Sequence, residues 1–212
     1  MFKRALLIGF ILCMASGALT AQEGGFIKAG YNAIMSGNYD AAVENYTRAI
    51  EKHSGYAPSY YGRGLALSHK ENYNAAIEDF NRAVELNPSF HEAYYALGLC
   101  YVYTGDYTKA LENLDKAVSI NNRNSNYFYA RANTYSLMQD GREKALADYA
   151  RAMDTDPSNG LPFYGRAVLY MKMERESDAM KDFEKYIELN GNKDGLAAEA
   201  QRLITEIQTS NE

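Results

Sequence analysis

Oppositely charged side chains recur along this chain at a nearly constant distance in sequence. In three segments an arginine is followed 16 or 17 residues later by an aspartate. These pairs are Arg63 with Asp79, Arg131 with Asp148, and Arg166 with Asp182. Because a guanidinium group can bind a carboxylate through two parallel hydrogen bonds, each pair is predicted to join two neighbouring elements.

The two charges of each pair appear and disappear together. Two other segments have neither charge, since Ala29 occurs there with Asn45, and Leu97 with Asn113. If each arginine bound the aspartate of the preceding segment, two of the three arginines would face asparagine. We therefore expect each ion pair to lie within its own segment. The alternative is a row of arginines that binds phosphate, but each arginine comes with a neutralising acid.

The other chemically versatile residues form no recognisable catalytic or metal-binding set. His53, His69 and His91 lack the spacing of zinc ligands. Cys100 follows Leu99 in an apolar context and is expected to be a small buried residue. The sequence has no glycine-rich phosphate loop and no serine elbow. We expect a protein with no catalytic residues, no metal and no cofactor.

The composition indicates a folded, acidic protein. The chain has 212 residues, 47% of them hydrophobic, and a formal net charge of -5. Such a chain has enough apolar side chains for a substantial core. Because nucleic-acid-binding proteins carry a basic surface, the acidic balance argues against nucleic acid as a partner. Tyrosine is unusually frequent, with 19 residues, whereas tryptophan is absent.

Residues 1–21 differ from the rest of the chain. Two basic residues precede a short apolar run, and mostly small residues follow, which is the pattern of a secretory signal. We expect cleavage after Ala18 or Ala21, a mature chain without a membrane span, and a periplasmic or secreted protein. The alternatives are an uncleaved signal that anchors the chain in a membrane, and a lipid attached to Cys13.

Small residues recur through residues 23–193 with an almost constant period. One column, spaced by 34 or 35 residues, comprises Gly30, Gly64, Gly98, Ala132 and Ala167. A second column comprises Ala42, Ala76, Ala110, Ala145 and Ala179. Apolar residues around them are three, four and seven positions apart, the spacing of one helix face. Each period is therefore predicted to form two helices that cross closely at the small residues.

The third unit shows the motif most fully. Its residues are Tyr94, Leu97, Gly98, Tyr101, Ala110, Leu114 and Ala117, with Pro88 and Pro157 closing neighbouring units. This pattern resembles the tetratricopeptide repeat family. The resemblance implies an all-α, right-handed superhelical solenoid of five helix-turn-helix repeats within residues 22–193, at about 23–56, 57–90, 91–124, 125–159 and 160–193. Residues 194–212 are expected to form a C-terminal capping helix and a tail.

The resemblance also predicts where a partner would bind. First helices of such repeats line the concave side of the solenoid, and a tyrosine column there comprises Tyr61, Tyr95, Tyr129 and Tyr164. Leu65, Leu99 and Asn133 come four residues later, followed by His69 and Tyr103. We expect an apolar, tyrosine-lined groove, because tyrosine combines a large contact area with a polar tip. The alternative is that these tyrosines only pack helix against helix within the stack.

The expected function is that of a scaffold for protein–protein interaction, with a partner segment more apolar than acidic. Family members that grip acidic C-terminal peptides use lysine and asparagine on this surface, whereas Ile27, Tyr31, Tyr61 and Leu65 stand there in this chain. Two alternatives remain open at this point. The chain could be a permanent structural or assembly subunit of a cell-envelope complex, or the tyrosines could bind carbohydrate.

Overall fold

The computed structural model describes residues 21–191 and 195–210, and every regular element within them is an α-helix. The predicted secretory signal lies outside the described residues, apart from Ala21, and so does Cys13. None of the helices in the described ranges combines the length and the apolar character needed to span a membrane.

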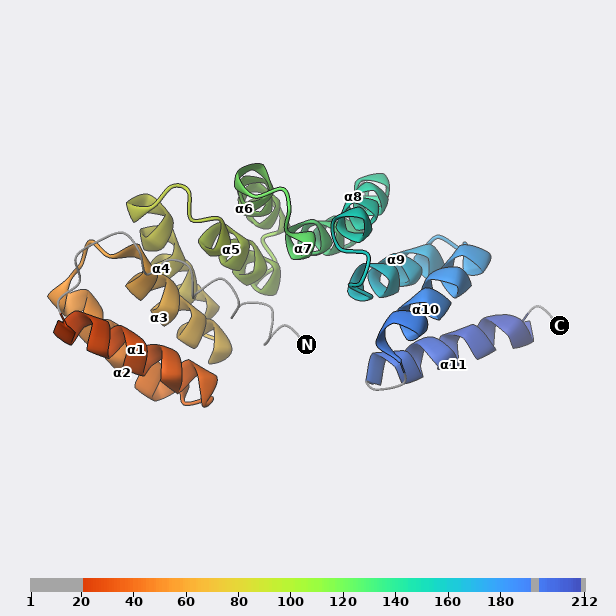
Figure 1. Ribbon diagram of the computed structural model, residues 1–212. Coiled ribbons are helices and arrows are strands. Elements are labelled where there is room, and N and C mark those ends of the chain that lie inside the picture. Colours follow the sequence, from red (N-terminus) through yellow and green to blue (C-terminus); the bar gives the residue numbers. More distant parts are fainter. Residues whose placement is uncertain (1–20, 192–194, 211–212) are drawn as a thin grey trace. The chain divides into compact units, whose positions relative to one another are not determined.

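The helices form two compact units, and consecutive helices pair as antiparallel hairpins (Figure 1). The helices of the N-terminal unit are α1 (Ala21–Met35), α2 (Tyr39–Lys52), α3 (Ala57–His69), α4 (Tyr73–Leu86), α5 (His91–Thr104) and α6 (Tyr107–Ile120). Those of the C-terminal unit are α7 (Ser125–Ser136), α8 (Arg142–Thr155), α9 (Leu161–Lys172), α10 (Glu176–Asn190) and α11 (Gly195–Ser210). The predicted all-α fold of repeated helical hairpins is confirmed.

Polar side chains start the second helix of the first three hairpins. Asn38, Asn72 and Asp106 each accept a hydrogen bond from the backbone N–H three residues later, at 3.1, 3.4 and 3.1 Å. Such a cap satisfies one of the backbone donors that the first turn of a helix leaves unpaired. These capping side chains therefore define where α2, α4 and α6 begin.

The small-residue columns mark where the two helices of a hairpin touch. A methyl group added at Gly64 would lie 2.7 Å from the ring of Phe80, and one added at Gly98 would lie 2.6 Å from Leu114. These distances are too short for a side chain, so the backbone of the first helix rests directly on the second. The alanines of the second column are fully buried.

The turn inside a hairpin requires a left-handed residue. Gly37 and Gly105 have φ values of 75° and 82° at this position, whereas Glu71 and Glu174 adopt φ values of 62° and 58° there. A residue with a side chain pays a conformational cost in this region. Two hairpins therefore keep a glutamate at a position that glycine would occupy without strain.

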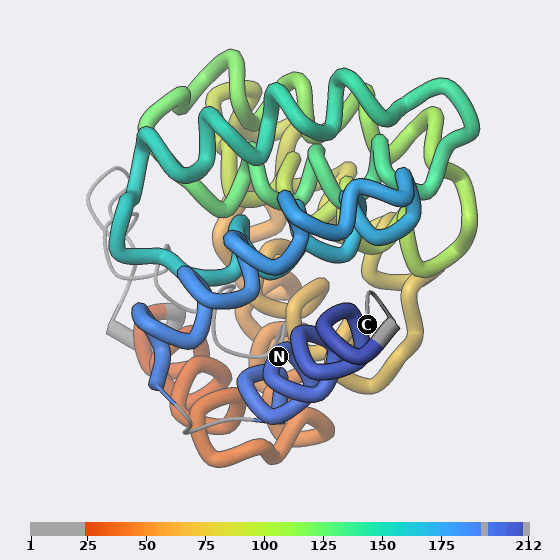
Figure 2. The backbone as a smooth tube through the Cα atoms, turned by 90° about the vertical axis from the view of Figure 1, so that its right-hand side faces the viewer, coloured from red at the N-terminus to blue at the C-terminus, as the bar shows by residue number. Residues whose placement is uncertain are grey.

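Helix α11 covers the exposed end of the last hairpin, beside α10 (Figure 2). Ala197, Ala200 and Ile204 of α11 are buried together with Phe183 and Tyr186 of α10. Without this helix the apolar face of α10 would meet water, which is why repeat stacks need a terminal cap.

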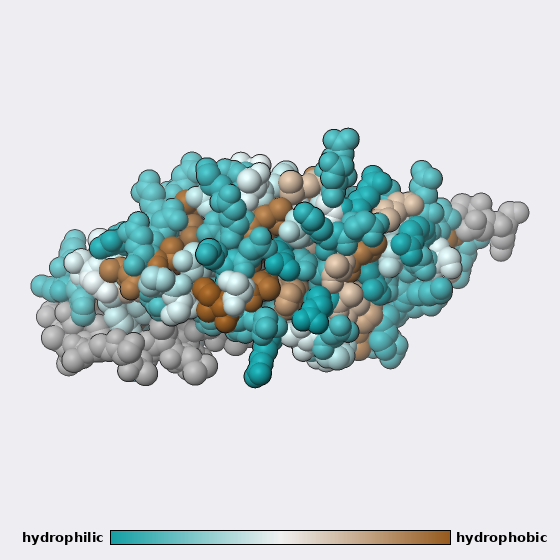
Figure 3. All heavy atoms as spheres, turned by 90° about the horizontal axis from the view of Figure 1, so that it is seen from above, coloured by the Kyte–Doolittle hydropathy of each residue, from teal (hydrophilic) through white to brown (hydrophobic). Residues whose placement is uncertain are grey.

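The face of the molecule seen in Figure 3 is mainly hydrophilic, with apolar side chains visible between the polar ones. Several basic residues of the second helices pair with acidic neighbours; for example, Arg48 lies 2.6 Å from Glu44 and Lys185 lies 2.8 Å from Glu188. Alternating charges of this kind do not make the continuous basic stripe that nucleic acid requires.

Candidate functional site

The three arginines of the sequence pairs each lie against the aspartate of their own hairpin. Arg63 donates two hydrogen bonds to Asp79, at 2.8 Å from Nε and 2.7 Å from Nη2. The same geometry joins Arg131 to Asp148 and Arg166 to Asp182, at 2.7 to 2.9 Å. The aspartates are buried. Hydrogen bonding to the carboxylate raises the pKa of Arg63 above its ordinary value, so the guanidinium stays charged.

In the hairpins without the charge pair, the residue at the aspartate position bonds within its own helix. Asn45 and Asn113 donate to the carbonyl oxygen four residues earlier in their own helix, both at 2.8 Å. Leu97 replaces the arginine in the third hairpin and is fully buried. The ion pairs therefore connect the two helices of three hairpins, and they do not form a row of cations directed at a ligand.

Two of the predicted binding tyrosines are buried, which corrects the prediction for the N-terminal unit. Tyr61 is 1% exposed and Tyr95 is 5% exposed. The ring of Tyr61 packs on Phe80 of its own hairpin at a centroid distance of 5.7 Å, and on Phe90, just before α5, at 4.8 Å. Tyr61 thus fills the junction between two hairpins.

Leu65 and Leu99 are expected from the sequence to line the groove, but both are buried. Burial of a leucine side chain stabilises the fold by about 1.5–3 kcal/mol. An apolar residue at this position is therefore more stable when it packs between helices than when it lines an open groove. Cys100, next to Leu99, is buried as well, and desolvation raises the pKa of its thiol to about 12. A thiol of this kind is a poor nucleophile at neutral pH.

His69 and Tyr103 lie at the edge of the N-terminal unit where the first helices end. His69 stacks on Tyr39 with ring centroids 4.7 Å apart, and Tyr103 stacks on Tyr73 at the same distance. Tyr103 nevertheless remains 52% exposed. Each stacked pair joins the start of one second helix to the end of the next first helix, so these rings connect successive hairpins.

In the C-terminal unit the corresponding tyrosines are half-buried. The ring of Tyr129 on α7 lies 6.2 Å from Tyr149 on α8, and Tyr164 on α9 meets Phe183 and Tyr186 edge-on at 5.5 and 5.2 Å. Both rings are supported by aromatic residues of the second helices. As whole residues, both tyrosines keep part of their surface accessible to solvent.

Asn133, one turn after Tyr129, is also half-buried and holds a polar contact. The hydroxyl of Tyr149 donates to Oδ1 of Asn133 at 2.6 Å. Burial raises the pKa of Tyr129, an effect that a hydrogen bond with Asn133 partly offsets. The three side chains are therefore neutral at physiological pH and fixed by mutual contacts. We call Tyr129, Asn133, Tyr164 and Val168 the tyrosine surface of the C-terminal unit.

One packing feature of this surface is absent from the sequence-based expectations. A column of small residues directly follows the tyrosine column and comprises Gly62, Ala96, Ala130 and Gly165. A methyl group at Gly165 would lie 2.8 Å from Tyr149 and 3.1 Å from Tyr129. Gly165 therefore lets α9 approach the two rings closely. The 34-residue recurrence of this column is the signal for that contact.

The remaining titratable residues do not assemble into a metal site within the described ranges. No group of three or more histidine, cysteine, aspartate or glutamate side chains is close enough there to hold a metal ion. Nδ1 of His91 lies 3.0 Å from the carboxylate of its neighbour Glu92. His53 lies beside Tyr56, with ring centroids 6.0 Å apart.

Comparison with known proteins identifies the repeats directly. Three segments match models of the tetratricopeptide repeat, at residues 57–90, 91–124 and 163–193. No curated protein matches the chain in sequence.

Several solved structures share the fold at low sequence identity. YrrB, described as a tetratricopeptide repeat protein with an unusual peptide-binding site, is 24% identical, with a TM-score of 0.66 over 84% of this chain and 90% of YrrB. MamA of Desulfovibrio magneticus is 19% identical, with a TM-score of 0.74 over 84% of this chain and 100% of that one. A thermophilic tetratricopeptide repeat protein of Thermus thermophilus is 22% identical, with a TM-score of 0.71 over 86% of this chain and 99% of that one.

At these identities the neighbours establish the fold alone. Tetratricopeptide repeats are usually non-catalytic and mediate protein interactions. The periodic small residues, the helical hairpins that they build and the three matching segments agree with one another. The chain therefore has the fold of a tetratricopeptide repeat solenoid, and three of its segments match the repeat in sequence.

Proposed function

We propose that this chain is a non-catalytic interaction scaffold that binds a segment of a partner protein on the tyrosine surface of its C-terminal unit. The observation that carries the proposal is the pair of half-buried rings, Tyr129 and Tyr164, on the first helices of two successive hairpins. The ring of Tyr129 packs on an aromatic residue of α8, and the ring of Tyr164 packs on an aromatic residue of α10, so both rings are held in place. A pre-organised ring loses little entropy when a partner covers its accessible part.

The charges around these rings indicate the chemistry of the partner. Helix α7 has one charged residue, Arg131, and α9 has two, Arg166 and Lys172. Both arginines are already bound to aspartates of the second helices. The surface therefore offers aromatic and neutral polar groups rather than charge, which suits a partner segment more apolar than acidic.

The class of ligand is supported by similarity. YrrB shares the fold and is described as having an unusual peptide-binding site. We carry over only the class of ligand, a peptide or protein segment, and no residue of YrrB. The reason to place such a segment on α7 and α9 is the accessibility of Tyr129 and Tyr164 in this chain.

We further propose that the protein acts outside the cytoplasm, in the periplasm or as a secreted protein, where it associates with envelope complexes. The support is the sequence of residues 1–21. Cell fractionation and N-terminal sequencing test this proposal. The expected mature protein begins between Leu19 and Glu23, whereas full-length protein in the cytoplasm contradicts export, and lipid on Cys13 indicates a lipoprotein.

Affinity capture followed by a direct binding measurement tests the interaction. Wild-type protein is used to capture partners from an extract of its native cell envelope, and the captured protein is then purified. Binding is compared for wild type, Tyr129→Ala, Tyr164→Ala and the exposed second-helix control Glu112→Ala, each checked for folding by circular dichroism. The tyrosine variants are expected to lose binding and the control to retain it. A partner that never dissociates would favour the permanent structural subunit instead.

A further inference from the structure

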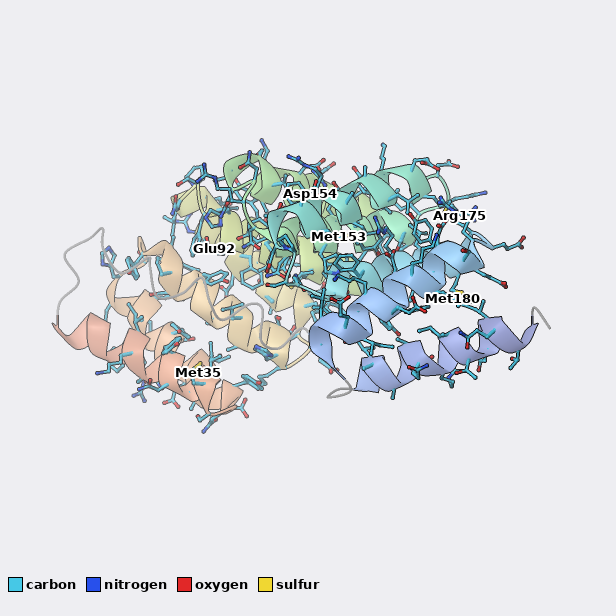
Figure 4. All side chains as sticks on the ribbon, turned by 45° about the vertical axis from the view of Figure 1, so that its right-hand side comes forward. Met35, Glu92, Met153, Asp154, Arg175 and Met180 are labelled. Atoms are coloured by element: carbon cyan, nitrogen blue, oxygen red, sulfur yellow. The ribbon has the colours of Figure 1, made fainter. Side chains whose placement is uncertain are left out.

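A groove opens in the C-terminal unit, between the start of α10 and the end of α11. Its volume is about 520 Å³, which lies within the range of ordinary ligand pockets. The half-buried Met180 and the buried Ile207, which is 3% exposed, supply apolar lining, and Glu174, Glu176 and Glu184 supply acidic lining. Figure 4 shows Arg175 at the start of α10 and Met180 on the side of α10 toward α11. The groove does not include the tyrosine surface described above.

The N-terminal unit fills the corresponding junctions with its own rings. Tyr39 and Tyr73 begin α2 and α4, and each stacks on a ring at the end of the following first helix. Glu176 begins α10 at the matching repeat position, and α11 contains no aromatic residue. The junction between α10 and α11 is therefore open where two equivalent junctions are closed by stacked aromatic side chains.

The charges on the rim are unequal. Arg175 binds Asp178 at 2.6 Å, and Lys181 lies 3.8 Å from the same carboxylate. Arg175 also lies over the ring of Tyr170, 4.4 Å from its centroid. Both cations of the groove are thus directed at one acid. Among the described residues, neither Glu174 nor Glu184 has an ion-pair partner, so the rim carries an excess of negative charge.

The backbone at Glu174 adds to this argument. Its φ of 58° lies in the left-handed region, where a side chain costs on the order of 1 kcal/mol relative to glycine. Two other hairpins have glycine at the matching turn position. Glu71 occupies the same position in the second hairpin, so the strained glutamate recurs, and at Glu174 it places an acidic side chain beside the groove.

We propose that this groove is a second docking site, which accepts a large apolar side chain of a partner protein flanked by lysine or arginine. The apolar side chain occupies the space over Met180 and Ile207 that rings fill elsewhere in the molecule. The flanking cations lie against Glu174 and Glu184. Complementary charge of this kind speeds association and makes the contact sensitive to salt.

A fluorescent peptide provides a direct test. The chain contains no tryptophan, so the emission of a peptide with one tryptophan between two pairs of lysines reports on the peptide alone. We expect a saturable blue shift with wild-type protein that weakens as salt is added. A peptide with glutamate in place of each lysine is expected not to bind. Absence of saturable binding of the lysine peptide would overturn the proposal.

Three sets of variants locate the binding site. Glu174→Lys combined with Glu184→Lys is expected to weaken peptide binding by about tenfold or more, because cations would then face cations. Glu78→Lys combined with Glu112→Lys makes the same charge change on the N-terminal unit and is expected to leave binding unchanged. Glu176→Tyr places a ring where α2 and α4 have one and is expected to block the groove.

The tyrosine surface is the internal comparison. Tyr129→Ala and Tyr164→Ala are expected to bind the lysine peptide as wild type does, so the two proposals can fail independently. Loss of binding in these variants, with normal binding by the Glu174→Lys and Glu184→Lys protein, would place the peptide on the tyrosine surface and contradict the groove assignment.

Discussion

Tyrosines of one column have different environments in the two units. Tyr61 and Tyr95 of the N-terminal unit are buried, whereas Tyr129 and Tyr164 of the C-terminal unit are half-buried. The residue one turn later differs as well. Leucine follows the buried tyrosines, at Leu65 and Leu99, whereas asparagine follows Tyr129 and valine follows Tyr164. A repeat position therefore fixes where a side chain starts on its helix, and its neighbours decide whether the ring is covered.

This difference divides the column into two roles. Buried tyrosines join hairpins, as Tyr61 does through its contacts with Phe80 and Phe90. Half-buried tyrosines pack on aromatic residues of the second helices and keep part of their surface accessible for a partner. The predictions below test this division.

The largest effect is expected from removing a buried ring. Tyr61→Ala leaves a cavity between two hairpins and should lower the free energy of unfolding by about 3–5 kcal/mol. Tyr164→Ala removes a partly exposed ring and should cost only about 1–2 kcal/mol. Urea titrations followed by circular dichroism measure both values. Equal losses would mean that the two tyrosines play the same role.

The ion pairs are common to both units, so breaking them should have similar effects in each. Asp79→Ala or Asp148→Ala leaves a partly buried arginine without its acid and should cost about 3 kcal/mol. Replacing both partners, as in Arg131→Leu with Asp148→Asn, copies the third hairpin and should recover most of that loss. Denaturant midpoints provide the comparison. A double variant no more stable than the single one would contradict the pairing argument.

Replacing the residue one turn after Tyr129 should make the environment of this tyrosine more like that of the buried Tyr61. Asn133→Leu removes the acceptor of the Tyr149 hydroxyl and should cost about 1–2 kcal/mol because a buried polar group loses its partner. We also expect Tyr129 to become less accessible. Fluorescence quenching by acrylamide and unfolding titrations check the two effects. Unchanged quenching would show that Asn133 does not control access to the ring.

The smallest effect concerns Cys100, which is buried like the tyrosines Tyr61 and Tyr95 of the N-terminal unit. Because the thiolate is the reactive form and burial raises the pKa of this thiol to about 12, the folded protein should react very slowly with a thiol reagent at pH 8. Reactivity should appear only as the pH approaches this raised pKa, or after denaturation. A Cys13→Ser background isolates Cys100. Rapid labelling of folded protein at pH 8 would refute the burial.

The helices can be predicted from the sequence because their periodic residues have one simple physical meaning. Gly64 and Gly98 occur where two helices touch, and Asn38 and Asn72 occur where helices begin. The charge pairs are predictable for a similar reason, since both partners vary together. The arginine and the aspartate are present or absent together from one repeat to the next. The repeats of a single chain therefore give the evidence of contact that an alignment of several sequences would otherwise provide.

The candidate site is less predictable because exposure depends on contacts between hairpins. The column that contains Tyr61 and Tyr129 looks uniform in sequence, yet the ring of Phe90 packs on Tyr61, whereas Tyr129 meets a glycine, Gly165, in the next hairpin and stays half-buried. The groove between α10 and α11 is not predictable at all from the sequence. Its signal is an absence, the lack of a ring at Glu176, which becomes meaningful only when the stacked pairs of α2 and α4 are known.

The dissociation constant of the captured partner, measured for matched variants, tests the central claim most directly. Tyr129→Ala is expected to weaken binding by about 2 kcal/mol or more, roughly 30-fold, as for a central interface aromatic residue. Tyr61→Phe, which keeps the buried ring of the N-terminal unit, is expected to bind as wild type does. If Tyr129→Ala and Tyr164→Ala both fold normally and bind with unchanged affinity, the tyrosine surface of the C-terminal unit is structural and the proposed function is wrong.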